Sequence, residues 1–195
     1  MEKLQQTPSQ TAGPFFAYSL TAKQYGYDYN SIIDRTLINE ATKGERIYIT
    51  GKVFDGKGNA ISDALIELWQ ADADGNYVTD FTDIDFANIP FKGFGRLGTG
   101  TDPHNIFTFK TIKPGSVNGQ VPHINVLLFM RGSLHKLVTR IYFSDEDNNN
   151  DALLNKVEAS RRKTLVASRI IKNGTIEYVF NIYLQGEMET VFFEL

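Results

Sequence analysis

From Arg46 onward, the chain is a succession of short segments in which apolar and polar residues alternate, separated by clusters of turn-forming residues. Side chains two apart in a strand point to the same face of a sheet, so this pattern predicts strands with one buried face. The predicted strands are 46–55, 64–71, 105–112, 123–130, 139–143, 164–168 and 175–184. The turn clusters lie at 55–59, 72–76 and 172–174, and the last, Lys-Asn-Gly, predicts a hairpin turn. Seven or eight short strands of this kind predict an all-β chain folded as an antiparallel β-sandwich.

The first 45 residues lack this alternation. Pro8, Gly13 and Pro14 prevent a long regular element near the start of the chain. Four tyrosines and two phenylalanines lie between Phe15 and Tyr29, which is too aromatic for a disordered tail. Residues 1–45 are therefore predicted to form an irregular N-terminal arm that packs against another surface, and residues 46–195 to form the β-sandwich domain.

Two further segments are interpreted from their composition. Residues 78–104 are predicted to form a long surface loop, which includes the glycines of 93–100 because neither a Lys-Ser/Thr pair nor a helical pattern follows them. After the polar cluster 145–151, apolar residues from Leu153 to Val157 fall at helical spacing, which predicts one short helix. The cluster lacks the glycine and the distal glutamate of a calcium loop, so a solvated helix entry is the better interpretation.

Composition excludes several classes of function. The chain has 195 residues, 42% hydrophobic, which fits one soluble domain. Its net charge is −3 and no basic cluster occurs, so nucleic acid is not an expected partner. The absence of cysteine rules out disulfides and thiolate sites and suits a cytoplasmic location. The longest apolar run, 126–130, is too short to span a membrane, and the first ten residues do not resemble a signal peptide.

His123 and Asn125 sit two apart at the head of the most apolar predicted strand, so their side chains should share one face. A second histidine at position 125 would make the pair half of a metal site. With asparagine there, the residues alone favour an ordinary strand-end histidine held by its neighbours. His104 and His135 lie in predicted turns or loops and are expected at the surface.

Arg131 comes directly after the same apolar run and directly before Gly132. An arginine at a strand end can simply be solvated. Its planar guanidinium can also hold a carboxylate with two hydrogen bonds. The residues alone leave both interpretations open.

Five segments are the most distinctive parts of the chain: 7–16, 51–77, 107–115, 122–132 and 186–195. Together they resemble the intradiol ring-cleaving dioxygenases, and within that family the alpha subunits of heteromeric members that act on protocatechuate. The resemblance covers nearly the whole chain, and its most specific parts are the opening TPSQTAGP and the ending ETVFF. It implies an oxidoreductase with the prealbumin-like β-sandwich of that family.

The resemblance also implies the ligand positions of an iron site. Active subunits of the family bind ferric iron through two tyrosines and two histidines. The matching positions in this chain are Tyr77, Val117, His123 and Asn125. Valine cannot ligate and asparagine replaces a histidine, so only Tyr77 and His123 remain of the four. Gln120 stands where active subunits have an arginine that steadies the substrate ring.

By the same resemblance, Fe(III) is expected in a partner beta subunit and not in this chain. The alpha subunit is expected to lend its arm and an arginine to the beta pocket, and the transferred substrate-contacting positions are Thr11, Gly13, Pro14 and Arg131. The implied reaction cleaves protocatechuate (3,4-dihydroxybenzoate) with O2 to 3-carboxy-cis,cis-muconate, in the catabolism of aromatic compounds.

Two alternatives belong to other classes of function. One is a stand-alone intradiol dioxygenase for another catechol, which Val117 and Asn125 argue against. The other is a non-catalytic, transthyretin-like binding module, which the N-terminal arm and the length of the resemblance argue against. Iron content and activity, measured with and without a beta partner, separate the three.

Overall fold

The structure is a computed structural model that describes residues 11–79 and 89–194. Most of it is β-sheet, with one short α-helix, α1 (Phe16–Leu20), near the start. The strands are β1 (Arg46–Gly51), β2 (Val53–Phe54), β3 (Leu65–Gln70), β4 (Phe94–Gly98), β5 (Phe107–Ile112), β6 (His123–Phe129), β7 (Leu137–Phe143), β8 (Val166–Lys172), β9 (Thr175–Val179) and β10 (Ile182–Tyr183). Four 3-10 helices join them: η1 (Ala22–Tyr25), η2 (Asn148–Asn150), η3 (Leu154–Lys156) and η4 (Arg162–Leu165).

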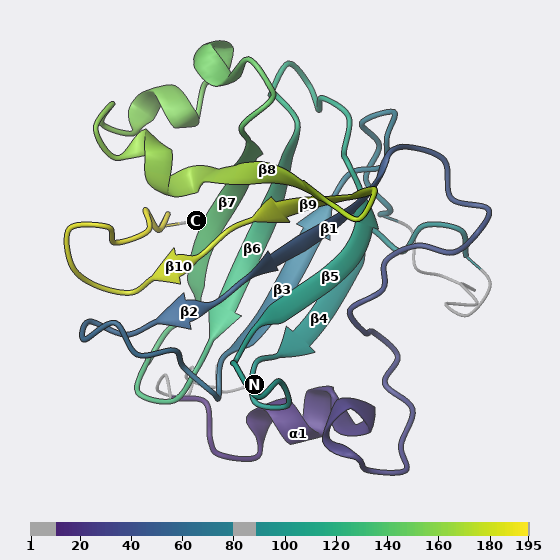
Figure 1. Ribbon diagram of the computed structural model, residues 1–195, viewed down its shortest axis with the longest axis vertical. Helices are drawn as coiled ribbons and strands as arrows, with labels where there is room; N and C mark the ends of the chain where they lie inside the picture. The colour runs from purple at the N-terminus through teal and green to yellow at the C-terminus, as the bar shows by residue number, and fades with distance from the viewer. Residues whose placement is uncertain (1–10, 80–88, 195) are drawn as a thin grey trace, which may run out of the picture.

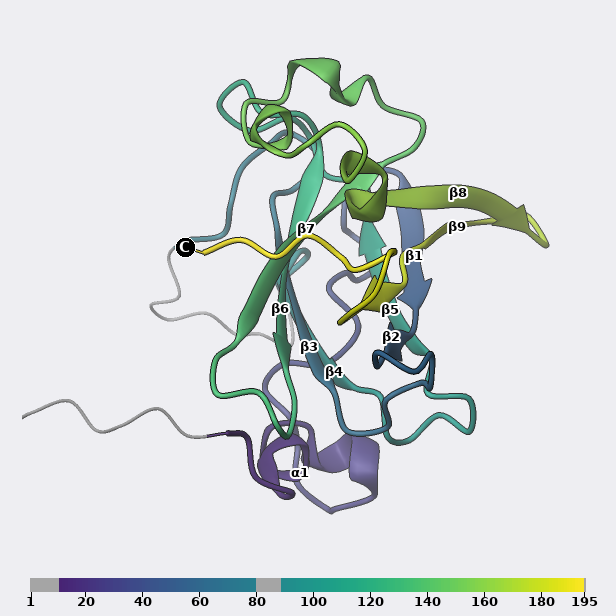
Figure 2. The same ribbon diagram turned by 90° about the vertical axis from the view of Figure 1, so that its left-hand side faces the viewer.

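Eight of these strands form one sheet in the order β4-β3-β6-β7-β8-β9-β1-β5 (Figure 1). The strands at the two ends of this order, β4 and β5, contact each other, so the sheet is nearly closed and barrel-like. Strands β2 and β10 pair separately. In Figure 2 the hairpin of β8 and β9 extends away from the body of the sheet. No helix among the described residues is long and apolar enough to cross a bilayer.

The all-β class is confirmed, but the sheet is mixed rather than clearly an antiparallel sandwich. Strand β7 pairs parallel with β8, and β1 pairs parallel with β9. Antiparallel neighbours can be joined by a tight hairpin, whereas a parallel pair needs a long crossover. The long connection 144–165 supplies that crossover between β7 and β8. The hairpin predicted at 172–174 is present: Lys172 pairs with Thr175, and Asn173 and Gly174 take φ values of 51° and 77°.

Strand β4 corrects the prediction of a continuous loop over 78–104. It pairs antiparallel with β3 from Trp69–Phe94 to Leu65–Gly98. Its glycines hid the strand pattern, and they are required by packing. A Cβ on Gly95 would lie 2.4 Å from Cδ1 of Leu37, which is fully buried, and a Cβ on Gly98 would lie 2.5 Å from the Tyr25 hydroxyl. The N-terminal segment therefore lies directly on β4.

The helix predicted after 145–151 is also absent. That region holds the three short turns η2, η3 and η4, and each ends at an extended residue, such as Val157 with ψ 136°. Asp151 caps the start of this region, since its side chain accepts hydrogen bonds from the backbone N–H groups of Leu153 and Leu154 and from the Tyr142 hydroxyl. The turn stops at Val157, where the Arg162 side chain donates to the carbonyls of Asn155 and Val157 that a continuing helix would use. Only α1 fits the expectation of one short helix, and it lies in the arm at the opposite end of the molecule (Figure 1).

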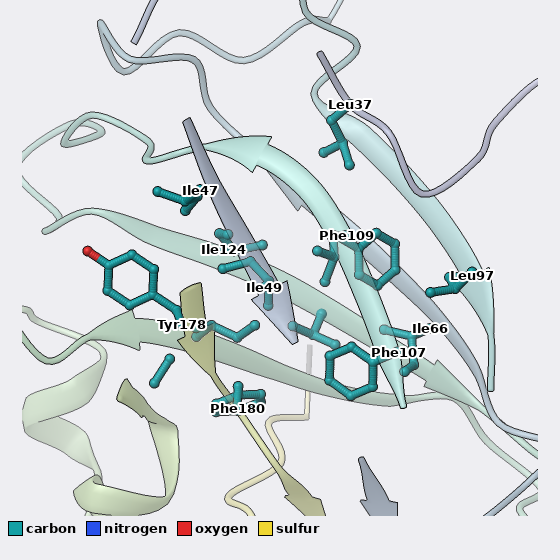
Figure 3. Packing of buried hydrophobic residues seen from close by; sticks show 14 of the residues in the cluster. Leu37, Ile47, Ile49, Ile66, Leu97, Phe107, Phe109, Ile124, Tyr178 and Phe180 are labelled. Atoms are coloured by element: carbon teal, nitrogen blue, oxygen red, sulfur yellow. The ribbon is translucent and has the colours of Figure 1, made fainter. Parts of the chain in front are cut away.

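The core lies inside the curled sheet (Figure 3). It is built from the alternate residues of the strands that face inward, and Figure 3 shows aliphatic side chains of β1, β3 and β6 packed against the rings of Phe107 and Phe109. Leu37 and Ile38 of the N-terminal segment belong to the same core. The inward face of β6 consists of Ile124, Val126 and Leu128. Its other residues, His123, Asn125, Leu127 and Phe129, therefore point outward.

Gly51 tests this packing. A Cβ at position 51 would lie 1.9 Å from the carbonyl oxygen of Phe180 and 2.9 Å from the Phe107 ring. Gly51→Ala must push the chain after β9 away from β1, and we expect it to lower the free energy of unfolding by about 2–3 kcal/mol. For a chain of this size that corresponds to a drop of roughly 4–12 °C in Tm.

Thermal unfolding measures this effect, with Gly13→Ala as the control, because a Cβ at position 13 meets nothing within 4 Å. If both variants melted with the wild type, the close approach at Gly51 would be wrong.

Candidate functional site

Strand register places three outward-facing side chains in a row across β3, β6 and β7. Trp69 pairs with Asn125, and Asn125 pairs with Arg140. His123 and Leu127 flank Asn125 on the same face of β6 because they lie two residues away on either side. The sheet alone therefore fixes one wall of a site, with an aromatic, an amide and a guanidinium side by side.

Tyr77 is brought to this wall by the turn that follows β3. Asp72 closes the turn, since its side chain accepts from the N–H groups of Asp74 and Asn76 and its backbone carbonyl accepts from Gly75 and Gly115. Gly75 has a φ of 84°, and a Cβ there would lie 2.1 Å from the Ser116 carbonyl oxygen. Only glycine permits this close contact between the two loops, which sets Tyr77 opposite Val117.

A directional chain of hydrogen bonds runs through the site. Arg140 Nε donates to Asn125 Oδ1 at 2.9 Å, and Asn125 Nδ2 donates to the Tyr77 hydroxyl at 3.0 Å. His123 Nδ1 lies 2.7 Å from the Val121 carbonyl, which can only accept, so Nδ1 carries the proton. The neutral ring then accepts at Nε2, where the Tyr77 hydroxyl is 3.4 Å away. Arg140 Nη1 also donates to Gln120 Oε1 at 2.6 Å.

The electrostatics keep both retained positions neutral. Burial raises the pKa of the Tyr77 phenol, against smaller opposing effects of the Asn125 hydrogen bond and the Arg140 charge. Burial also lowers the pKa of His123, and the Arg140 charge adds to that effect. The phenol is therefore protonated at neutral pH, and its proton is directed at His123.

These residues line an open cleft of about 460 Å³, which we call the Tyr77–His123 pocket. The four sequence-predicted ligand positions all lie in it. Its lining residues are Trp69, Tyr77, Val117, Asn118, Gln120, His123, Asn125, Leu127, Lys136, Val138 and Arg140. The Trp69 and Tyr77 rings are tilted, with centroids 4.6 Å apart.

The donor set does not fit ferric iron. Val117 offers no donor atom, and the amide of Asn125 already bonds to Arg140 and Tyr77. Tyr77 would have to lose its proton, and a metal cation would lie in the same pocket as the Arg140 guanidinium. Among residues 11–79 and 89–194, no group of three or more His, Cys, Asp or Glu side chains could hold a metal instead.

The residues predicted to contact substrate lie at the other end of β6. Arg131 is 59% exposed and its Nε forms an ion pair with Asp63. The Thr11 hydroxyl accepts from the Gly132 N–H at 2.9 Å, so the arm lies beside Arg131. Gly13 and Pro14 follow on the surface, and Phe16 of α1 packs 5.5 Å from Phe129 at the end of β6. His104 and His135 are exposed, as expected.

Arg140 was missed by the sequence reasoning, as were Trp69 and Lys136. The signal was present in the hairpin between β6 and β7. Once the glycine turn at 132 is fixed, antiparallel pairing places Arg140 opposite Asn125. Without a known register, one arginine in an alternating strand looks like any solvated residue.

Comparison with known proteins identifies the family of the chain. A family model described as Dioxygenase matches residues 20–186. The chain belongs to this family. The protocatechuate 3,4-dioxygenase alpha chain of Burkholderia cepacia is 46% identical over the full length of both chains. The beta chain from the same organism is 34% identical and matches 87% of this chain and 79% of its own.

A solved structure supports the fold assignment. The dioxygenase domain of a carbohydrate-binding fusion protein from Streptomyces sp. SirexAA-E superposes with a TM-score of 0.62 at 26% identity, covering 96% of this chain and all of that one. The resemblance to the intradiol dioxygenases noted in the sequence is thus confirmed. The mixed, nearly closed sheet described above is consistent with that family's fold.

The poor donor set generates a prediction for the purified chain. Expressed alone with ferric iron, it should be colourless and contain less than about 0.1 iron per chain, because two neutral donors hold ferric iron weakly at pH 7. Visible absorption and metal analysis measure this. Stoichiometric iron with a tyrosinate charge-transfer band would contradict the geometry of the pocket.

Proposed function

We propose that this chain is the alpha subunit of a heteromeric intradiol dioxygenase that cleaves protocatechuate with O2 to 3-carboxy-cis,cis-muconate. The ferric iron belongs to a partner beta subunit, which supplies the redox-active centre for ring cleavage. The observation that carries the proposal is the state of the Tyr77–His123 pocket. Two of its four ligand positions have lost their donors, and the two retained side chains hydrogen-bond within the protein. The full-length similarity to an alpha chain, and the weaker similarity to a beta chain, support the same assignment.

In this proposal the chain acts on the partner's pocket through the surface beside β6. Arg131 bonds to Asp63 through Nε, and no hydrogen bond of its two terminal nitrogens occurs within the described residues. Those nitrogens form the end of the guanidinium fork that suits a carboxylate. Thr11, Gly13 and Pro14 lie on the same surface and would approach the substrate with little side-chain bulk. The proposed arm, residues 1–45, includes residues that pack on β4, such as Leu37. Its first ten residues lie outside the described part of the chain.

The proposal is tested by co-expression with a beta subunit. The two-chain complex should contain about one iron for each alpha–beta pair and turn over protocatechuate, while the alpha chain alone should do neither. Activity of this chain alone on any catechol would favour a stand-alone enzyme. If the complex had the same iron content and activity as the beta chain alone, this chain would have no role in the reaction and the proposal would be wrong.

Arg131→Ala should lower kcat/KM for protocatechuate roughly ten- to a hundredfold, because a charge-assisted hydrogen bond in a partly desolvated pocket contributes about 1.5–3 kcal/mol. Turnover of catechol, which lacks the carboxylate, should change much less. Arg131→Lys should recover part of the loss, since it keeps the charge without the fork.

Steady-state kinetics of the complex on both substrates measures the effect, and Asp63→Asn serves as a control for loss of the ion pair alone. Equal losses of Arg131→Ala on both substrates would assign Arg131 to the interface or the fold.

Deleting residues 1–14 tests the arm separately. The deletion removes Thr11, Gly13 and Pro14 but keeps Phe16, whose ring packs against Phe129. We expect Tm of the isolated chain to fall by less than roughly 2 °C, in line with the loss of surface contacts. Turnover by the complex should fall at least about tenfold, the effect of losing roughly 1.4 kcal/mol in the transition state. Normal turnover by the truncated complex would exclude the arm from the substrate site.

A further inference from the structure

The lining of the Tyr77–His123 pocket has an unbalanced charge. Lys136 and Arg140 are positive, and none of the lining residues is an aspartate or glutamate. Neither cation takes part in a salt bridge within residues 11–79 and 89–194. A cleft with two cations and no carboxylate in its walls attracts an anion.

One buried carboxylate, Asp151, lies near the pocket without lining it. Asp151 is fully buried and accepts hydrogen bonds from the Tyr142 hydroxyl at 2.9 Å and from the backbone N–H groups of Val121, Leu153 and Leu154. Tyr142 and Arg140 lie two apart in β7 and share one face, so Asp151 lies on the same side of the sheet as the pocket, behind Tyr142. Its single negative charge offsets part of the charge of the two cations and leaves a net positive charge. Lys136, by contrast, is exposed at the open end of the cleft.

Arg140 retains donors for such an anion. A guanidinium has five N–H groups. Asn125 and Gln120 take two of them, and the neighbouring Tyr142 hydroxyl accounts for a third at most. Counted over residues 11–79 and 89–194, two N–H groups therefore remain, and a carboxylate accepts two in a bidentate pair.

The rest of the pocket is shaped for a flat ring. Trp69, 40% exposed on the outer face of β3, forms one wall, and the tilted Tyr77 ring lies beside it. Leu127 and Val138, a cross-strand pair of β6 and β7, form an aliphatic floor. The volume of about 460 Å³ is within the range of small-molecule sites.

The polar groups inside need no metal. Tyr77, His123 and Asn125 satisfy one another in the chain that begins at Arg140, and none of them is among the buried polar atoms left without a partner in the described residues. A ligand can therefore bind beside the two rings and the two cations without the free-energy cost of a buried polar atom that lacks a hydrogen bond.

We propose that the Tyr77–His123 pocket binds a small aromatic monocarboxylate without a metal, with the carboxylate at Arg140 and Lys136 and the ring against Trp69 and Tyr77. No bond is made or broken there. The inference concerns binding by this chain alone and does not depend on the proposed function, so either one can fail without the other.

Trp69 makes the site directly observable, because it is the only tryptophan in the chain. The full-length chain is titrated with benzoate in chelator-treated buffer while its tryptophan fluorescence is followed. We expect a saturable change with benzoate and at least tenfold weaker binding of benzamide, which has the same shape without the charge. Arg140→Gln should weaken benzoate at least tenfold, and Arg140→Lys should weaken it less. Lys57→Gln, which alters an exposed cation in the turn after β2, should bind as the wild type does.

Three results would overturn the proposal: no saturable change up to 10 mM benzoate (roughly 2.7 kcal/mol of binding at 25 °C), equal binding of benzamide, or equal binding by the Arg140→Gln variant. Thermal unfolding of each variant shows whether it is folded. If Arg140→Gln proves unfolded, Lys136→Gln decides the question, because Lys136 is exposed and makes no hydrogen bond or salt bridge in the described part of the chain. Benzoate binding that Lys136→Gln leaves unchanged would then count against the site.

Discussion

The hydrogen bond from Arg140 to Asn125 determines the polar arrangement of the Tyr77–His123 pocket on the outer face of the sheet. It joins two strands side by side, at a point where register places a guanidinium next to an amide. From Asn125 the hydrogen-bond chain continues to Tyr77 and His123, so three of the four positions that match metal ligands bond to one another. The positive charge of Arg140 lies beside the neutral side chains of Tyr77 and His123. This charge disfavours a ferric ion in the pocket and favours an anion.

Strand β6 divides the functional roles of the chain between its two ends. Its first residues contribute His123 and Asn125 to the pocket, while the turn after its last residue carries Arg131 and receives the arm through Thr11. The seven residues of β6 are held by core packing on one face and by β3 and β7 at the edges. Because β6 pairs along both edges, it fixes the distance in sequence and the side of the sheet at which the chain's own pocket and the proposed contribution to a partner's pocket lie.

The sequence predicted those elements whose pattern is local. Residue type and spacing predicted the alternating strands and the Asn173-Gly174 hairpin. They also predicted that His104 and His135 lie at the surface. Strand β4 could not be predicted, because the glycines that let Leu37 and Tyr25 approach it remove the alternation that identifies a strand. The helix expected from Leu153 to Val157 stops after one short turn, because Val157 is extended and Arg162 binds the carbonyls of Asn155 and Val157, which the spacing of apolar residues does not reveal. Resemblance to the family predicted that Tyr77, Val117, His123 and Asn125 belong to one site. The place of Arg140 in that site could be found only once the pairing of β6 with β7 was known.

The central claim is that the metal of the assembled enzyme lies outside this chain. Crystals of the two-chain complex, measured with X-rays just above and just below the iron absorption edge, test it most directly. The account predicts a strong anomalous difference peak in the pocket of the beta subunit and none between Tyr77 and His123 of this chain. A peak of comparable height beside Tyr77 and His123 would contradict it.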